Sequence, residues 1–223
     1  MSVYITGDVH GDFSELQQWC HAMRPKKKDI VVILGDVALN YFGDWRDCER
    51  KKLANALGPE IFCIHGNHEM RPEDAGCYEL IDWHGGKVWW QPEFPNLIFA
   101  KDGEIYELGG KTVIVLGGAY SVDKSYRLAY GYRWFPTEQP SDEIKKFAED
   151  QLDRVGWKVD VVFSHTCPKR LIPHYRDSRQ GLAQARILAR CSRKSKNVMN
   201  GSFLLNAFFH DIFYSSSADC CKQ

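Results

Sequence analysis

Four short strand-like runs in this sequence are each followed closely by a turn and a polar side chain, and this pattern limits the folds open to the chain. The runs are residues 3–5, 29–34, 61–64 and 159–163. The second is continuously apolar from Ile30 to Leu34, which is typical of a strand in a sheet covered on both faces. Helices are expected over residues 13–24, 46–57 and 141–155. Strands that alternate with helices predict an α/β fold, and 223 residues are enough for one such domain with a sizeable core.

The middle of the chain has a different pattern. Shorter strands are expected at residues 87–90, 97–100, 104–108 and 112–116, where apolar stretches are separated by glycine, proline and asparagine turns. Residues 121–139 are aromatic and basic, include Arg127 and Arg133, and are predicted to form a loop. Two interpretations of this loop stay open. It either roofs a site and shapes substrate entry, or it is a surface flap packed on itself.

The polar side chains that follow the four main runs are all of types that bind metal ions. In an α/β sheet, ligands collect beyond the carboxyl ends of the strands, so these side chains are expected to meet in one pocket. They are Asp8 and His10 after the first run, Asp36 after the second, Asn67 and His68 after the third, and His165 after the fourth.

The donor types in this set indicate which ions would bind. Carboxylate oxygens, imidazoles and an amide oxygen, with no thiolate among them, suit Mn, Fe, Zn or Mg better than a structural zinc. A carboxylate has two oxygens and can bridge two ions. Two ions about 3.5–4 Å apart form the usual clamp for in-line displacement at phosphorus. We therefore expect a shared metal site with chemistry directed at phosphoesters.

Composition excludes several other classes of protein. Lysine plus arginine equals aspartate plus glutamate, 29 of each, so no overall field favours nucleic acid or an anionic membrane. No run is long enough to span a membrane, and Met1 leads straight into a strand without a signal segment. The eight cysteines form no CxxC pair, and reduced thiols are favoured over a cysteine zinc site. A cytoplasmic location is expected.

The motifs resemble those of the calcineurin-like metallophosphoesterase family. The resemblance rests on Gly7-Asp8-Val9-His10-Gly11, Gly35-Asp36, Gly66-Asn67-His68-Glu69 and the lone His165. It implies a four-layer αββα sandwich with a dinuclear centre of two divalent ions, manganese first among them. It also implies that Asp36 bridges the ions, that Asp8 and His10 hold one of them, and that Asn67 and His165 hold the other.

The same resemblance implies hydrolysis of a phosphomonoester or phosphodiester by a water molecule that the two metals activate. Metal-bound water has a pKa of about 7, so hydroxide is available without a serine or cysteine nucleophile. His68 would protonate the leaving oxygen or steady charge in the transition state. Arg71 could bind a phosphate oxygen of the substrate, although an exposed arginine at a helix start is an equally open interpretation.

Two departures from the family's pattern bear on activity. Leu39 and Asn40 stand where the family's protein phosphatases carry Asp-Arg, so His68 lacks the carboxylate that orients it in those enzymes. The family's Gly-His-x-His pair is also missing, because His174 and His210 are the only histidines after His165 and neither follows a glycine. If the pair is missing, each metal loses one imidazole.

The composition of the chain changes after about residue 173. From His174 onward there is no glutamate or tryptophan, and eight lysines and arginines face three aspartates. We therefore expect a metallophosphoesterase domain over residues 1–172 and an atypical segment over 173–223, as a shifted reading frame or a replaced terminus would produce. Two other functions stay open beside the enzyme. One is an inactive scaffold with the same fold, and the other is nucleic-acid binding through the basic tail. The tail has little of the aromatic interleaving that single-strand binding needs.

Overall fold

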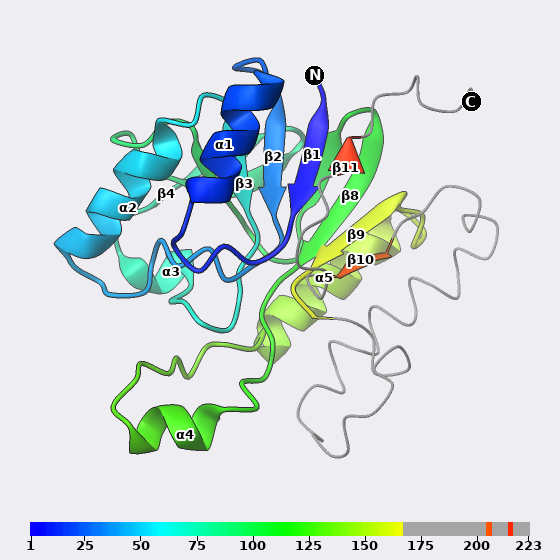
Figure 1. Cartoon of the computed structure of the whole chain (residues 1–223). Coiled ribbons are helices and arrows are strands. Elements are labelled where there is room, and N and C mark those ends of the chain that lie inside the picture. Colours follow the sequence, from blue (N-terminus) through cyan, green and yellow to red (C-terminus); the bar gives the residue numbers. More distant parts are fainter. Residues whose placement is uncertain (167–203, 207–213, 216–223) are drawn as a thin grey trace.

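A computed structural model describes residues 1–166, 204–206 and 214–215 (Figure 1). The helices are α1 (Ser14–Met23), α2 (Trp45–Asn55), α3 (Pro72–Ala75), α4 (Lys124–Ala129) and α5 (Asp142–Arg154). The strands are β1 (Val3–Thr6), β2 (Ile30–Ile33), β3 (Glu60–Cys63), β4 (Glu79–Trp83), β5 (Gly86–Trp90), β6 (Leu97–Ala100), β7 (Ile105–Leu108), β8 (Lys111–Leu116), β9 (Val161–Ser164), β10 (Leu204–Asn206) and β11 (Tyr214–Ser215). His174, His210 and the boundary expected at residue 172 lie outside these ranges.

The described strands form two sheets. The first has the order β11-β1-β2-β3-β6-β5-β4, and the second has the order β10-β9-β8-β7. Strands β1, β2, β3 and β6 are parallel neighbours in the first sheet, and β8 and β9 are parallel in the second. Parallel neighbours end at the same edge of a sheet, so the turns after β1, β2 and β3 lie next to one another.

The two sheets pack face to face around one cluster of buried apolar side chains. Strand β2 shows how its residues divide between the two faces of its sheet. Ile30 and Val32 point into this cluster together with Val115 of β8 and Phe163 of β9. Because side chains alternate along a strand, the residues between them point the other way.

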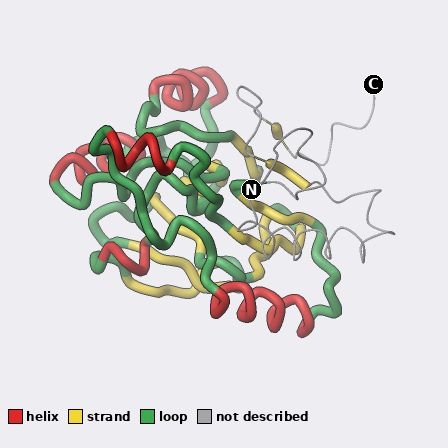
Figure 2. Tube along the Cα trace, turned by 90° about the horizontal axis from the view of Figure 1, so that it is seen from below, coloured by secondary structure: helices red, strands yellow, loops and turns green. Residues whose placement is uncertain are grey.

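Helices cover the outer faces of both sheets. Val31 and Ile33 of β2 pack against Leu16 of α1 and Ala54 of α2. On the second sheet a separate cluster joins α5 to β8 and β9; its members include Ile114, Leu116, Ala148, Leu152 and Val162. The order of layers is thus helix, sheet, sheet, helix, with the strands lying between the helices in Figure 2. The predicted four-layer αββα sandwich is confirmed.

Five described elements were not predicted from the sequence: α3, α4 and β4, and the short strands β10 and β11. Residues 121–139 contain the helix α4, which projects from the body of the protein (Figure 1). Strand β4 was not expected because its side chains are mostly exposed or half-buried, and it is held by pairing with β5 at the sheet edge. Helix α3 has only four residues. In the described ranges, no helix is long and apolar enough to cross a lipid bilayer, and Cys20, Cys48, Cys63 and Cys77 are free thiols.

Candidate metal centre

Asp8 and His10 lie in the turn that follows β1. His10 has a positive φ of 48°, a left-handed conformation that few residues other than glycine adopt. Its backbone N–H donates to the carbonyl of Asp36 at 2.8 Å, which ties the β1 turn to the β2 turn. This bend brings His10 Nε2 to 3.8 Å from Asp8 Oδ2.

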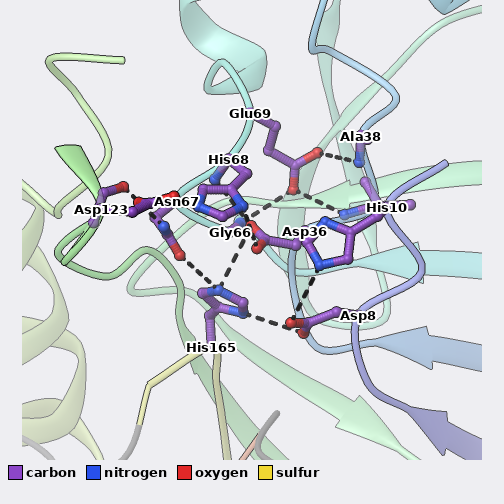
Figure 3. A network of polar contacts seen from close by, with 12 residues as sticks. Asp8, His10, Asp36, Ala38, Gly66, Asn67, His68, Glu69, Asp123 and His165 are labelled. Carbon is purple, nitrogen blue, oxygen red and sulfur yellow. Dashed lines mark hydrogen bonds and ion pairs between the residues drawn. The ribbon is translucent and has the colours of Figure 1, made fainter. Parts of the chain in front are cut away.

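Asp36 lies at the centre of the cluster, in the turn after β2 (Figure 3). It is 3% exposed and also has a left-handed φ, of 49°. Two neighbouring glycines make room for it and for His165. A Cβ on Gly66 would lie 2.0 Å from Asp36 Oδ1, and a Cβ on Gly35 would lie 2.2 Å from His165 Nδ1. The glycines in these motifs are therefore required by the close approach of three turns.

His165 comes from the second sheet, at the end of β9. Its Nδ1 makes a 2.8 Å hydrogen bond with the carbonyl of Leu34, and its Nε2 lies 2.9 Å from Asn67 Oδ1 and 3.6 Å from Asp36 Oδ1. Both ring nitrogens thus face carbonyl oxygens, and a neutral imidazole carries only one proton. In the tautomer with that proton on Nδ1, Nε2 presents a lone pair toward Asn67 and Asp36.

Asn67 presents a second lone pair to the same point. Its Nδ2 donates to Ser121 Oγ at 2.9 Å, so its carbonyl oxygen is the atom that faces His165. With Asp36 Oδ1 and the Nδ1-protonated tautomer of His165, three electron-pair donors from three strand ends converge. A cation satisfies such a set, and oxygen and nitrogen ligands bound at about 2.0–2.2 Å stand about 3 Å apart. The donors thus fit a divalent ion.

Two groups of carboxylate and imidazole donors are each compact enough to hold a metal ion, and they share Asp36. Within each group the donor atoms all lie within 4.8 Å of one another; the groups are Asp8, Asp36 and His165, and His10, Asp36 and His68. Asp8 stands near both, 3.7 Å from His165 Nδ1 as well as beside His10. The predicted pairing of Asp8 with His10 on one ion stays a prediction, since Asp8 lies near both imidazoles.

His68 lies beside Asp36 and is partly open to solvent. Its backbone N–H donates to Asp36 Oδ1 at 2.9 Å, and its Nδ1 lies 3.3 Å from Asp36 Oδ2. The other ring nitrogen, Nε2, lies 3.8 Å from Asp123 Oδ1. Burial lowers the pKa of His68 below its ordinary value, while the carboxylates of Asp36 and Asp123 oppose that effect.

Glu69 binds the turns after β2 and β3 to each other. This buried carboxylate accepts backbone N–H groups from Gly66 at 3.1 Å, from Ala38 at 3.0 Å and from Val37 at 3.4 Å. Burial raises the pKa of Glu69 to about 8, with a further contribution from Asp36, against the lowering effect of the three N–H donors. Glu69 therefore holds the backbone of the two turns that carry Asp36 and His68.

We expect Glu69→Ala to destabilise the fold by several kcal/mol, because it leaves three buried N–H donors without an acceptor. Each such donor costs about 1–3 kcal/mol when unsatisfied. Glu69→Gln retains one carbonyl oxygen and should lose much less. Chemical denaturation of both variants measures the difference. Equal midpoints for Glu69→Ala and the unaltered protein would show that the turns are held by other contacts.

Arg71 contacts Asp102 and Thr137 and none of the residues around Asp36 that are described above. Its side chain is 3% exposed, Nη1 lies 2.6 Å from Asp102 Oδ2, and Nε donates to the carbonyl of Thr137 at 2.7 Å. Arg71 is therefore not the exposed helix-start arginine of the second interpretation. Its contact with a substrate phosphate stays a prediction, and Nη2 of the same group has no hydrogen-bond partner among the described residues.

Six of the seven predicted site residues thus lie together, and three further residues join them. Glu69 stands in a quoted motif, but its role required the fold to be seen. Ser121 and Asp123 lie more than fifty residues from Asn67 and His68 and carry no sequence signal of the contact.

An αββα sandwich that gathers carboxylates and imidazoles at its strand ends has the donor groups that can hold divalent ions. The sequence model of the calcineurin-like phosphoesterase family matches residues 1–187. The chain is a member of that family, whose members generally hydrolyse phosphoesters and typically bind two divalent metals.

Solved structures also align with most of the chain. One is the crystal structure of the protein of unknown function AQ665 from Aquifex aeolicus, which is 13% identical; the alignment covers 92% of this chain and 89% of that chain, with a TM-score of 0.37. A second is 15% identical over 88% of this chain and 80% of its own, with a TM-score of 0.44. No curated protein matches the chain.

Proposed function

We propose that this protein is a metal-dependent phosphoesterase that holds two divalent ions around Asp36. The observation that carries the proposal is the convergence of three metal-type donor atoms from three strand ends: His165 Nε2 lies 2.9 Å from Asn67 Oδ1 and 3.6 Å from Asp36 Oδ1. Carboxylate, amide and imidazole donors together suit Mn²⁺ first and Fe, Zn or Mg next. When bound, such ions supply Lewis acidity and an activated water for attack on phosphorus.

In this proposal the residues around Asp36 are ligands of two different ions. Asp8 and His165 hold one ion with Asp36, and Asn67 adds its amide oxygen to the same side. His10 and Asp36 hold the other.

His68 lies beside Asp36 with part of its ring open to solvent. It is the group placed to donate a proton to the departing oxygen of the ester. The substrate is a phosphomonoester or phosphodiester that enters from the exposed side of His10 and His68.

Hydrolysis of p-nitrophenyl phosphate and its bis ester with added Mn²⁺ tests the proposal. We expect His68→Ala to lower kcat by about 10²–10⁴-fold on phenyl phosphate, whose leaving group needs a proton, and by less on the p-nitrophenyl esters. His21→Ala, an exposed position on α1, is the matched control and should retain full activity.

The alternative is a scaffold that has the fold and no catalysis. It would be supported if the unaltered protein with Mn²⁺ turned over neither ester faster than His68→Ala does. Metal content per chain separates the cases further, since a scaffold has no requirement for two ions and the proposed enzyme does.

A further inference from the structure

The segment between β8 and α4 enters the candidate centre from the side opposite to β1. Ser121 is 2% exposed, and its Oγ accepts the 2.9 Å hydrogen bond from Asn67 Nδ2. Two residues later, Asp123 stands with Oδ1 3.8 Å from His68 Nε2 (Figure 3). Asn67 and His68, which are neighbours in the turn after β3, are thus each in contact with a side chain of this segment.

The orientation of Asn67 decides whether it can bind a cation at all. Its amide has an oxygen at one end and an NH₂ group at the other, and only the oxygen has a lone pair to offer. A half-turn of the amide would point two hydrogens at His165 and Asp36. A serine hydroxyl can donate or accept, and here Ser121 Oγ accepts from the NH₂ group on the far side, which anchors the amide with its oxygen toward the centre.

Ser121 is itself held by a buried carboxylate. Its backbone N–H donates to Glu138 Oε1 at 3.2 Å, and the indole N–H of Trp134 donates to Glu138 Oε2 at 2.7 Å. The start of the segment is equally constrained, because a Cβ on Gly118 would lie 2.3 Å from the carbonyl of Glu138. Glu138 is 2% exposed. The hydroxyl therefore has a defined position before any ion binds.

Asp123 is constrained in a similar way. Its second oxygen, Oδ2, lies 3.6 Å from Arg127 Nη1, one turn further along α4. Arg127 Nε in turn donates to the carbonyl of Arg133 at 2.9 Å. The carboxylate thus presents one oxygen to Arg127 and the other to the ring of His68.

We propose that Ser121 and Asp123 are positioning residues, Ser121 fixing the amide of Asn67 with its oxygen toward the ions and Asp123 fixing the ring of His68. This inference rests on the proposed phosphoesterase function. Outer contacts of this kind orient metal ligands and catalytic groups, and their loss typically costs about 10–100-fold in affinity or activity.

Mn²⁺ titration calorimetry tests Ser121 without any need for catalysis. Ser121→Ala should weaken Mn²⁺ binding by about 10–100-fold, and Ser125→Ala, an exposed serine of the same segment, should leave it unchanged. The decisive comparison repeats Ser121→Ala in an Asn67→Asp background. A carboxylate has two equivalent oxygens, so its orientation no longer matters and the loss should nearly vanish.

Two results would overturn the role of Ser121. One is unchanged Mn²⁺ affinity in Ser121→Ala. The other is the same loss in both backgrounds, which a merely structural serine would produce. Thermal unfolding of each variant shows whether it has folded.

Asp123 is tested by the dependence of kcat on the leaving group. p-Nitrophenolate departs as a stable anion and needs little proton donation, whereas phenolate needs more. Asp123→Asn should therefore lower kcat for phenyl phosphate by about 10–100-fold, p-nitrophenyl phosphate much less, and KM for neither. Asp82→Asn, at an exposed residue on β4, is the control. Equal losses on both esters, or none, would overturn this role.

Failure of the proposed function gives a different pattern. A protein that binds Mn²⁺ but hydrolyses no ester would overturn that function and the role of Asp123 with it. The Mn²⁺ affinities would still decide the role of Ser121. A protein that binds no Mn²⁺ would overturn both proposals.

Discussion

Asp36→Ala is expected to lower the affinity for Mn²⁺ by more than about 100-fold and to remove measurable ester hydrolysis. The reason is that Asp36 belongs to both groups of donors, so its loss removes a ligand from each ion at once. Removal of an outer contact alone typically costs about 10–100-fold, and a shared direct ligand should cost more. Calorimetry with Mn²⁺ and metal content after purification measure the loss.

A milder replacement separates metal binding from folding. Asp36 Oδ1 accepts the backbone N–H of His68, so alanine also loosens the β3 turn. Asp36→Asn retains an oxygen for that hydrogen bond but removes the charge that attracts the ions. It should unfold like the unaltered protein and still bind Mn²⁺ poorly. Two tightly bound ions per chain in Asp36→Asn would contradict the shared role of Asp36.

Asp102→Ala should produce a large loss of stability, about 3–5 kcal/mol, the usual cost of removing one partner of a buried ion pair. Asp102 and Arg71 each have a side chain that is 3% exposed, and their 2.6 Å contact links the β6–β7 turn to the start of α3. Asp102 Oδ1 also accepts the backbone N–H of Gly117 at 2.6 Å. Its loss therefore leaves a buried N–H donor unpaired, and it leaves Arg71 with only the longer, 3.9 Å contact to Glu73 Oε1 as a carboxylate partner among the described residues.

A double replacement provides the control for this pair. In Arg71→Met/Asp102→Ala no buried charge is left uncompensated, and buried ion pairs can often be replaced by apolar groups at little cost. We expect the double variant to unfold at a higher urea concentration than Asp102→Ala, with a similar dependence on urea. A double variant less stable than the single one would show that the pair contributes more than mutual neutralisation.

Local patterns were enough to predict most of the fold. Residues 29–34 read as a buried strand because both faces of β2 are covered, Ile30 and Val32 by the second sheet and Val31 and Ile33 by helices. The helix expected over 141–155 forms as α5, and Ser141 Oγ caps it by accepting the N–H of Ile144. Where the pattern was weak, as in β4, an edge strand with exposed side chains was missed.

The sequence by itself determined which residue types follow the strands. A strand and the turn after it are local, since the alternation of side chains and the glycines next to Asp36 act within a few residues. Six of the seven candidate residues therefore lie together in the structure. The resemblance built on the same motifs agrees with the family match over residues 1–187.

Tertiary structure alone decided which of these side chains meet, and in what grouping. His165 reaches Asp36 and Asn67 only because the second sheet packs across the first. Ser121 and Asp123 reach the β3 turn from a distant segment. Arg71 is withdrawn from solvent by Asp102, a partner thirty-one residues away in the chain. Such contacts depend on how whole layers pack, and the free energy of that packing is spread over many residues, so no short motif records it.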